Sequence, residues 1–249
     1  MSIELVNVHK AFGANEVLRG FSLNIPEGET MAIIGGSGTG KSVLLKHLVG
    51  LLTPDQGEVW VDGENISRLD QASIYRVRRN IGFVFQFAAL FDSMTIAENV
   101  GMGLARLDTM SDEEVRARVE TCLELVDLVG YGARLPSELS GGQRKRVGFA
   151  RAIATSPKYI LYDEPTTGLD PVTKSVIDEL IVRMSDDLGV TGVVITHDMD
   201  SAFRISDRMA MLYEGQNRWE GTPEQIQQTD DPIVKGFIEG RPELLESAT

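Results

Sequence analysis

The sequence is poor in cysteine, in net positive charge and in long apolar runs, and each scarcity excludes a class of protein. One cysteine among 249 residues cannot form an internal disulfide, which suits a reducing cytosol. A formal net charge of −13 argues against a nucleic-acid partner, because nucleic-acid-binding domains present a basic footprint. No uncharged apolar run approaches the roughly 18 residues of a membrane-spanning helix, and the N-terminus lacks the pattern of a signal peptide. We therefore expect a protein that does not cross a membrane by itself.

The rest of the composition is that of a globular protein, with 42% hydrophobic and 24% charged residues. The length suffices for one large α/β domain, or for a core with a subdomain. The single cysteine, Cys122, lies on an apolar helical stripe with Val119, Leu123 and Val126. We expect this thiol to be buried packing.

The glycine-rich segment 35–42 fits the phosphate-binding pattern G-x-x-x-x-G-K-[ST]. It follows the apolar residues 31–34, a predicted strand, and precedes a helical pattern that begins at Val43. A helix N-terminus behind such a loop directs backbone N–H groups at a phosphate, and a Cβ atom would block their close approach. The candidate binding residues are Gly35, Gly36, Ser37, Gly38, Thr39, Gly40, Lys41 and Ser42. Lys41 would reach the β- and γ-phosphates of a nucleoside triphosphate and Ser42 would ligate Mg²⁺; a glycine-rich turn without a ligand is the alternative.

Two carboxylates follow the buried strand predicted to begin at Tyr159. Asp163 can hold the same Mg²⁺ ion as Ser42. Glu164 can polarise an attacking water as a general base. In the alternative interpretation the pair only ends a strand with solvated charges.

Two further polar residues follow apolar strands. His197 comes directly after residues 193–196, at a strand end where α/β sheets bind ligands, and could donate a hydrogen bond to a γ-phosphate. A structural or exposed histidine is the alternative. Gln86 follows the apolar residues 81–85 and could reach Mg²⁺ or the attacking water, although taken alone it is a weak signal.

A second anion site is predicted at residues 140–143, where a capping box opens a helix that runs through Ala154. The candidate residues are Ser140, Gly141, Gly142 and Gln143. A hydroxyl, bare glycine amides and a helix N-terminus together suit a phosphate, and the basic residues 144–146 would deepen the positive field. A capped surface helix is the alternative. One nucleotide does not need two cradles, so we expect this one to serve the nucleotide on another copy of the chain.

The order of these patterns predicts an α/β fold. Residues 1–86 and 157–221 are expected to form an α/β core with N-terminal antiparallel strands, and residues 87–156 an inserted helical subdomain. Residues 58–61, followed by Asp62 and Gly63, have the chemistry of a hairpin. Residues 209–213 are expected to close the sheet, and residues 222–249 to form a C-terminal helix and tail.

Together, the motifs resemble the full motif set of ABC-transporter ATPase subunits, in order and over almost the whole chain. The resemblance implies a P-loop NTPase of the ABC ATPase type, with a mixed sheet and an inserted helical subdomain, which hydrolyses ATP with Mg²⁺. It implies a head-to-tail dimer in which each ATP lies between residues 35–42 of one copy and 140–143 of the other. It also implies that Phe12 stacks on adenine, unless it is a core aromatic, that Gln86 links hydrolysis to a membrane permease, and that Asp170 crosses the dimer interface. Thr167 and Gly168 stand where many members have Ser-Ala.

A finer resemblance joins segments 85–95, 144–147, 161–171 and 231–240 to the MlaF branch of the family. That branch drives phospholipid transport for outer-membrane lipid asymmetry, with a permease and a substrate-binding protein of the MCE type. The resemblance implies a peripheral subunit on the cytoplasmic face of the inner membrane. In the family the tail packs on the neighbouring ATPase subunit, so Phe237 and Ile238 would be its apolar anchors, or would cover their own domain.

Three other functions remain as alternatives. The first is an ABC subunit for a different cargo, the second is a soluble ABC protein that acts on DNA or ribosomes, and the third is a regulatory subunit that does not hydrolyse ATP. The acidic charge and the lack of a long coiled-coil insertion or a second ATPase half disfavour the soluble protein. Asp163, Glu164 and His197 together disfavour a subunit without turnover.

Overall fold

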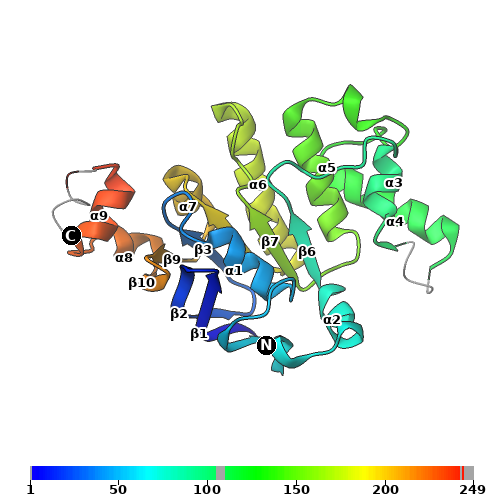
Figure 1. The fold of residues 1–249 in the computed structure, drawn as a ribbon. Helices are drawn as coiled ribbons and strands as arrows, with labels where there is room; N and C mark the ends of the chain where they lie inside the picture. The colour runs from blue at the N-terminus through cyan, green and yellow to red at the C-terminus, as the bar shows by residue number, and fades with distance from the viewer. Residues whose placement is uncertain (1, 105–109, 242, 244–249) are drawn as a thin grey trace. The chain divides into compact units, whose positions relative to one another are not determined.

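The computed structural model describes residues 2–104, 110–241 and 243, in two compact units (Figure 1). The first unit combines residues up to 77 with residues from 191 onward, and the second covers residues 78–190. Strands β6 (Ile81–Val84) and β7 (Tyr159–Asp163) belong to the second unit with the helices. The division of the sequence at residues 86 and 157 into core and subdomain stays a prediction.

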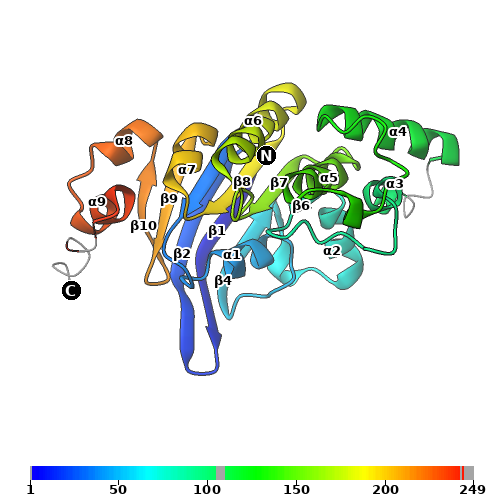
Figure 2. The same ribbon diagram turned by 90° about the horizontal axis from the view of Figure 1, so that it is seen from above.

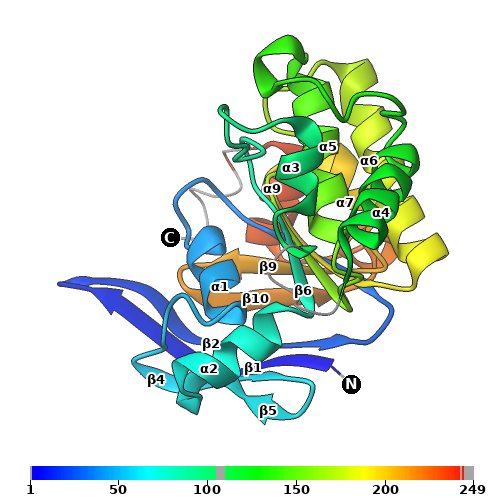
Figure 3. The same cartoon turned by 90° about the vertical axis from the view of Figure 1, so that its right-hand side faces the viewer.

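The first unit begins with an antiparallel sheet in the order β2-β1-β4-β5 (Figures 2 and 3). Its strands are β1 (Ser2–Phe12), β2 (Asn15–Pro26), β4 (Gln56–Val61) and β5 (Glu64–Asn65). The predicted N-terminal antiparallel pair is confirmed, with Ile3 opposite Ile25. The predicted hairpin is confirmed as well, because Asp62 and Gly63 adopt φ values of 53° and 77° between β4 and β5, the left-handed pair that a tight hairpin turn requires.

A second sheet positions the candidate site of this unit. Strand β3 (Thr30–Ile34) runs parallel to both β8 (Thr191–Thr196) and β9 (Arg208–Tyr213). All residues of β3 and β8 are buried, as the continuous apolar runs of parallel strands require. Ile34 pairs with Thr196, so the loop after β3 and the residue after β8 leave the sheet at the same edge. Helices α1 (Lys41–Leu48) and α7 (Met199–Ile205) follow these two strands.

The prediction that residues 209–213 close the sheet is wrong. Strand β10 (Gln216–Gly221) pairs antiparallel with β9 and forms the edge. The turn between them places Glu214 and Gly215 at φ values of 47° and 79°. No residue of β10 is fully buried, so the strand lacks the apolar alternation by which a sequence indicates a strand.

The C-terminal helices α8 (Pro223–Gln227) and α9 (Pro232–Glu239) close an apolar cluster of the first unit. Ile226, Ile233 and Val234 are buried in this cluster, and Phe237 and Ile238 pack against it. The two expected anchors thus cover their own unit, which is the second of the alternatives that the sequence left open. Figure 1 shows α8 and α9 beside β9 and β10.

Helices dominate the second unit, as predicted for residues 87–156. Around the parallel pair β6 and β7 lie α3 (Ile96–Gly101), α4 (Asp112–Leu125), α5 (Gly141–Ile153) and α6 (Pro171–Leu188), while α2 (Gln71–Arg78) ends at its boundary. Among the described residues, Ile66–Arg68 and Pro136–Glu138 form 3-10 turns. The capping box at Ser140 is confirmed, and the buried Cys122 is too. Among the described helices, none combines the length and apolar character that crossing a membrane requires.

We predict that His47 makes the free energy of unfolding depend on pH. Its side chain is buried in α1, with Nδ1 2.8 Å from the carbonyl oxygen of Val43 and Nε2 lacking a hydrogen-bond partner in the described part of the chain. Desolvation lowers the pKa of His47 below 6.5, so the folded state resists the proton that the unfolded chain gains below this pH. Stability is therefore lost as the pH falls below 6.5, by at most about 1.4 kcal/mol per pH unit.

The variant His47→Leu removes the titrating group and fills the buried position with an apolar side chain. Urea denaturation at several pH values between about 5 and 7.5 measures the difference. The other two histidines are present in both proteins, so their contributions cancel in the difference between the two unfolding free energies. Equal pH dependence of the two unfolding free energies contradicts the prediction.

Candidate functional site

The loop between β3 and α1 has a backbone that only glycine fits at two positions. Gly35 has φ 153°, and a Cβ atom there would lie 2.4 Å from the main-chain oxygen of Leu212. Gly40 has φ 106° and caps α1, and its Cβ atom would lie 2.5 Å from a methyl group of Val17. Real Cβ atoms do not come so close to other atoms. The tight packing of the loop against Leu212 and Val17 therefore requires glycine at both positions, whether or not a ligand is bound.

The positively charged side chain of Lys41 lies inside this loop. The side chain of Lys41 is 6% exposed, and its ammonium donates to the carbonyl oxygens of Gly35 and Gly36 over 2.7 and 2.8 Å. Thr39 donates its hydroxyl hydrogen to the same carbonyl of Gly36 over 2.9 Å. Ser42 is exposed in the first turn of α1. A buried ammonium beside backbone N–H groups at a helix N-terminus forms a site suited to phosphate.

Two other predicted residues belong to the first unit. His197 is exposed directly after β8, and since Ile34 pairs with Thr196, it leaves the sheet at the edge where the phosphate-binding loop begins. Phe12 ends β1 and is 48% exposed, so the alternative of a core aromatic is excluded. The ammonium of Lys10 lies 5.7 Å from the centre of the Phe12 ring. The ring therefore has an open surface on which a base could stack.

In the second unit, Asp163 is the last residue of β7 and Glu164 follows in a left-handed conformation with φ 48°. This conformation is uncommon for a residue other than glycine and stores about 1 kcal/mol or more of strain. The carboxylate of Glu164 accepts a hydrogen bond from the Thr167 hydroxyl over 3.1 Å. The main-chain N–H of Thr167 donates to the carbonyl oxygen of Glu164 over 3.3 Å. The local chain thus determines where this carboxylate points.

The predicted second anion site forms the N-terminus of α5. The Ser140 hydroxyl accepts from the N–H of Gln143 over 3.2 Å, and the Gln143 side chain accepts from the N–H of Ser140 over 2.9 Å. A Cβ atom on Gly142 would lie 2.5 Å from a methyl group of Thr173 in α6, whereas Gly141 faces open space. The first turn keeps bare amides next to a hydroxyl group.

The basic residues that follow Gln143 donate hydrogen bonds to main-chain carbonyl oxygens. Arg144 donates to the carbonyl oxygen of Leu139, and Arg146 to those of Val126 and Asp127. Lys145 donates to carbonyl oxygens of the segment 164–167. The predicted positive field at this N-terminus stays a prediction, since hydrogen bonds to neutral carbonyl oxygens do not cancel the charge of these side chains.

The distribution of acidic residues distinguishes α1 and α5 from the other helices of the described ranges. These two have neither an acidic N-cap nor an acidic residue in the first turn. Acidic residues begin the others, namely Asp70 for α2, Glu98 for α3, Asp112 for α4, Asp170 for α6, Asp198 for α7, Glu224 for α8 and Asp231 for α9. A carboxylate at a helix N-terminus is favourable, so its absence from α1 and α5 in an acidic chain leaves two N-termini open to an external anion.

Gln86 lies two residues beyond β6, in a turn that contains two consecutive left-handed alanines. Ala88 and Ala89 have φ values of 60° and 48°. The guanidinium of Arg151 in α5 donates to their carbonyl oxygens over 2.5 and 2.6 Å, and desolvation lowers the pKa of Arg151. Phe87 beside this turn is 84% exposed. The turn therefore presents Gln86 and an aromatic side chain from a backbone that α5 holds.

Asp170 has a local role in addition to its predicted one. Its carboxylate caps α6 and accepts from the N–H groups of Val172 and Thr173 and from the Thr173 hydroxyl. The Thr173 hydroxyl bond, together with the backbone N–H bonds, lowers the pKa of Asp170. The side chain is exposed at the start of the helix, where it remains accessible to a second copy.

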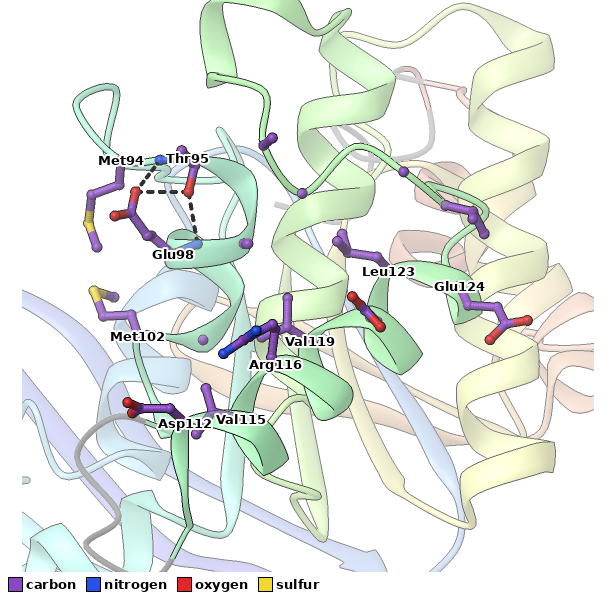
Figure 4. A pocket seen from close by; sticks show the side chains of 17 residues that line it. Met94, Thr95, Glu98, Met102, Asp112, Val115, Arg116, Val119, Leu123 and Glu124 are labelled. Atoms are coloured by element: carbon purple, nitrogen blue, oxygen red, sulfur yellow. Dashed lines mark hydrogen bonds between the residues drawn. The ribbon is translucent and has the colours of Figure 1, made fainter.

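Sequence reasoning missed a groove of about 1240 Å³ between α3 and α4. Its apolar lining includes Met94, Met102, Val115, Val119 and Leu123, and its charged lining consists of Glu98, Asp112, Arg116, Glu120 and Glu124 (Figure 4). Thr95 and Glu98 form a capping box for α3, in which the Thr95 N–H and hydroxyl groups lower the pKa of Glu98. This box was the available signal, because a Thr-x-x-Glu pattern indicates the start of a helix.

The residues predicted to bind Mg²⁺ are distributed over the two units. Ser42 lies in the first unit, whereas Gln86 and Asp163 lie in the second. A hydroxyl, an amide and a carboxylate are hard oxygen donors that fit this ion. In the described part of the chain, no group of three or more acidic, histidine or cysteine side chains is placed to hold a metal ion, so phosphate and water oxygens would have to supply the remaining ligands. The roles of all these site residues stay predictions.

Comparisons with known proteins agree with the motifs. Residues 18–167 match the family model described as ABC transporter. The chain is 42% identical to the chloroplastic protein TRIGALACTOSYLDIACYLGLYCEROL 3 of Arabidopsis thaliana, over 96% of this chain and 73% of that protein. It is 37% identical to the probable ribonucleotide transport ATP-binding protein mkl of Mycobacterium leprae, over 97% of this chain and 70% of that one. The chain is also similar in fold to a solved structure, the dimer of the ATP-binding cassette MJ0796 in a post-hydrolysis state bound to ADP and Pi. The TM-score is 0.81 and the identity 38%, over 89% of this chain and 98% of that one.

We predict that Gly35→Ala destabilises the fold and that Gly36→Ala does not. The new Cβ atom at position 35 would meet the Leu212 oxygen at 2.4 Å, whereas at position 36 the nearest atom, in Thr39, is 3.6 Å away. Overpacking of this kind costs about 1–3 kcal/mol. Thermal unfolding followed by circular dichroism should give a clearly lower Tm for Gly35→Ala alone, and equal Tm values for both variants would refute the packing argument.

Proposed function

Because this chain belongs to the ABC transporter family and is an ATP-hydrolysing, ATP-binding subunit of that family, we propose that it drives the transport of phospholipid between membranes. The 42% identity to a plant protein named after a galactolipid supports a lipid cargo, as does the resemblance to the MlaF branch. The ATP-binding subunit of a transporter for another cargo is the second candidate, which the ribonucleotide named in the mycobacterial relative favours.

The proposed working unit is a head-to-tail dimer around two ATP molecules. The N-terminus of α1, with Lys41 inside its loop, holds the phosphates in one copy. The N-terminus of α5 in the second copy, with its exposed Gly141 amide and Ser140 hydroxyl, completes the site. Both N-termini lack the acidic residues that begin the other described helices, and this supports a shared anion. Phe12 would stack on the adenine, and Asp170 would contact the second copy.

In the proposed hydrolysis, Glu164 takes a proton from the attacking water. Its carboxylate is oriented by the Thr167 hydroxyl, and the charge that develops on the γ-phosphate is stabilised by Lys41 and by a hydrogen bond from His197. Mg²⁺ would be held by Ser42, Asp163 and Gln86 and would neutralise phosphate charge when bound. After hydrolysis the α5 N-terminus of the second copy no longer binds the nucleotide, and the dimer opens.

Glu164→Gln is expected to lower ATP turnover about 100-fold or more, since general-base catalysis contributes roughly 10²–10⁴-fold. Affinity for ATP should persist, because the amide leaves the phosphate-binding loop unchanged, and Mg-ATP should accumulate a dimer seen by light scattering. Glu179→Gln, an exposed residue of α6, is the matched control and should behave as wild type. Unchanged turnover in Glu164→Gln would remove Glu164 from the role of base.

We further propose that the groove between α3 and α4 receives a helix of a membrane permease. Four carboxylates and one guanidinium line it together with apolar side chains, and this lining favours a helix with basic flanks and an apolar face. Met94 and Met102, on the α3 side of the groove, can adapt to an apolar side chain of the partner. This docking would make the chain a peripheral subunit at the cytoplasmic face of the inner membrane. An MCE-type lipid-binding protein is the third proposed component.

The double variant Glu120→Lys/Glu124→Lys should lose the permease, because it reverses two of the charges that line the groove. After co-expression and affinity purification, the recovered permease should fall at least tenfold, while the ATPase activity of the isolated subunit stays unchanged. The control Glu179→Lys/Asp186→Lys makes the same change of charge on exposed positions of α6 outside the groove. Equal recovery for the two double variants argues against docking in the groove.

Copurification also tests the cargo. Mass spectrometry of small molecules bound to the purified complex should find phospholipid above the level that the detergent-solubilised membrane carries nonspecifically. Enrichment of a nucleotide or an anion, without phospholipid, would favour the second candidate.

A further inference from the structure

Lys145 joins α5 to the loop that carries Glu164, within the second unit. It lies in the second turn of α5 and is 7% exposed. Its ammonium donates to the main-chain oxygens of Glu164, Pro165 and Thr167 over 3.4, 2.6 and 3.1 Å. An ammonium has three donors, so these three carbonyls satisfy it completely.

A charge at this position is unfavourable for stability, which suggests that it is there for another reason. Desolvation lowers the pKa of Lys145 to about 8, and the charge of Glu164 partly opposes this shift. A buried charge is often replaceable by an apolar side chain without loss of stability. An apolar side chain would fill the space but would remove the cation that donates to all three carbonyl oxygens, so the specific effect of the lysine is on the loop backbone.

The loop that Lys145 binds decides the direction of the Glu164 carboxylate. Glu164 is left-handed with φ 48°, a conformation that persists only when its surroundings hold it. Thr167 contributes both the carbonyl that accepts from Lys145 and the hydroxyl that donates to the Glu164 carboxylate. A shift of the Lys145 ammonium therefore moves the carbonyl and the hydroxyl of Thr167 together.

The first turn of α5, directly before the turn that carries Lys145, is the predicted binding site for the ATP of a second copy. Residues 140–143 and Lys145 belong to one continuous helix, which moves as a rigid rod with a rise of about 1.5 Å per residue. Contact of the helix N-terminus with a phosphate thus fixes the position of the ammonium. The phosphate and the Glu164 loop are then connected through a single helix and three hydrogen bonds.

We propose that Lys145 is a positioning residue that transmits occupancy of the α5 N-terminus, by ATP held on a second copy, to the orientation of the general base Glu164 in its own chain. The inference rests on the proposed dimer and on the proposed role of Glu164. It means that each ATP in the dimer would influence hydrolysis at the other site, because each chain contributes α5 to one site and Glu164 to the other.

The test compares Lys145→Met, which removes all three donors, with Lys145→Arg, which keeps a cation with several donors. The matched control is Lys158→Met, at the opposite end of β7 from Asp163 and exposed. Lys145→Met should lower kcat at least tenfold, with an ATP dissociation constant within about twofold of wild type, and Lys145→Arg should recover part of kcat. Lys158→Met should match wild type. Full kcat in Lys145→Met, measured well below its Tm, overturns the proposal.

A double-mutant cycle separates transmission from a simple structural role. Ser140→Ala weakens the α5 N-terminus, and if the two residues act along one connection, the double variant Ser140→Ala/Lys145→Met should be about as slow as the slower single variant. Effects on kcat that multiply mean independent roles and overturn the proposal. If Lys145→Met does not fold, Lys145→Gln, which retains two N–H donors, takes its place in the cycle with the same two outcomes. Failure of the proposed function would appear differently, as a wild-type protein without ATPase activity or without phospholipid in its complex.

Discussion

Hydrogen bonds from cationic side chains to main-chain carbonyl oxygens hold the functional loops of the second unit. Lys145 binds the segment after β7, Arg151 binds the turn after Gln86, and Arg118 binds the carbonyls of Ile153 and Ala154 at the end of α5. Loops leave such carbonyls without helix or sheet partners, and a buried one must find a donor. Each bond to a charged donor is worth about 1.5–3 kcal/mol. Since Lys145 and Arg151 both project from α5, this helix sets the geometry of two loops at once.

Much of the candidate site was predictable, because its motifs depend on local backbone chemistry. The positive φ values of Gly35 and Gly40, and the capping box at Ser140, follow from residue types within a few positions of one another. The central parallel strands β3 and β8 were predictable as well, since they are buried throughout and their sequences are mainly apolar. Edge strand β10 was not, because Trp219 is its only large apolar residue and none of its residues is fully buried.

The hydrogen-bond partners of the basic side chains in α5 were the least predictable part of the site. Arg144, Lys145 and Arg146 follow the phosphate motif in sequence, yet their partners lie 5 to 22 positions away along the chain. A carbonyl group carries no residue-specific signal, so no pattern in the sequence marks it as an acceptor. The groove was missed for a related reason, because its lining comes from α3, α4 and the segment 129–133, which only the folded unit brings together.

The burial of the single cysteine has a practical consequence for studying how two copies meet. Cys122 is fully buried in α4, and desolvation raises the pKa of its thiol, so the reactive thiolate is scarce and inaccessible to reagents in the folded protein. A spin label or fluorophore aimed at thiols would therefore find no native target. One cysteine introduced at a chosen surface position would carry the only probe on each subunit, and distances between two such probes would report opening and closing directly.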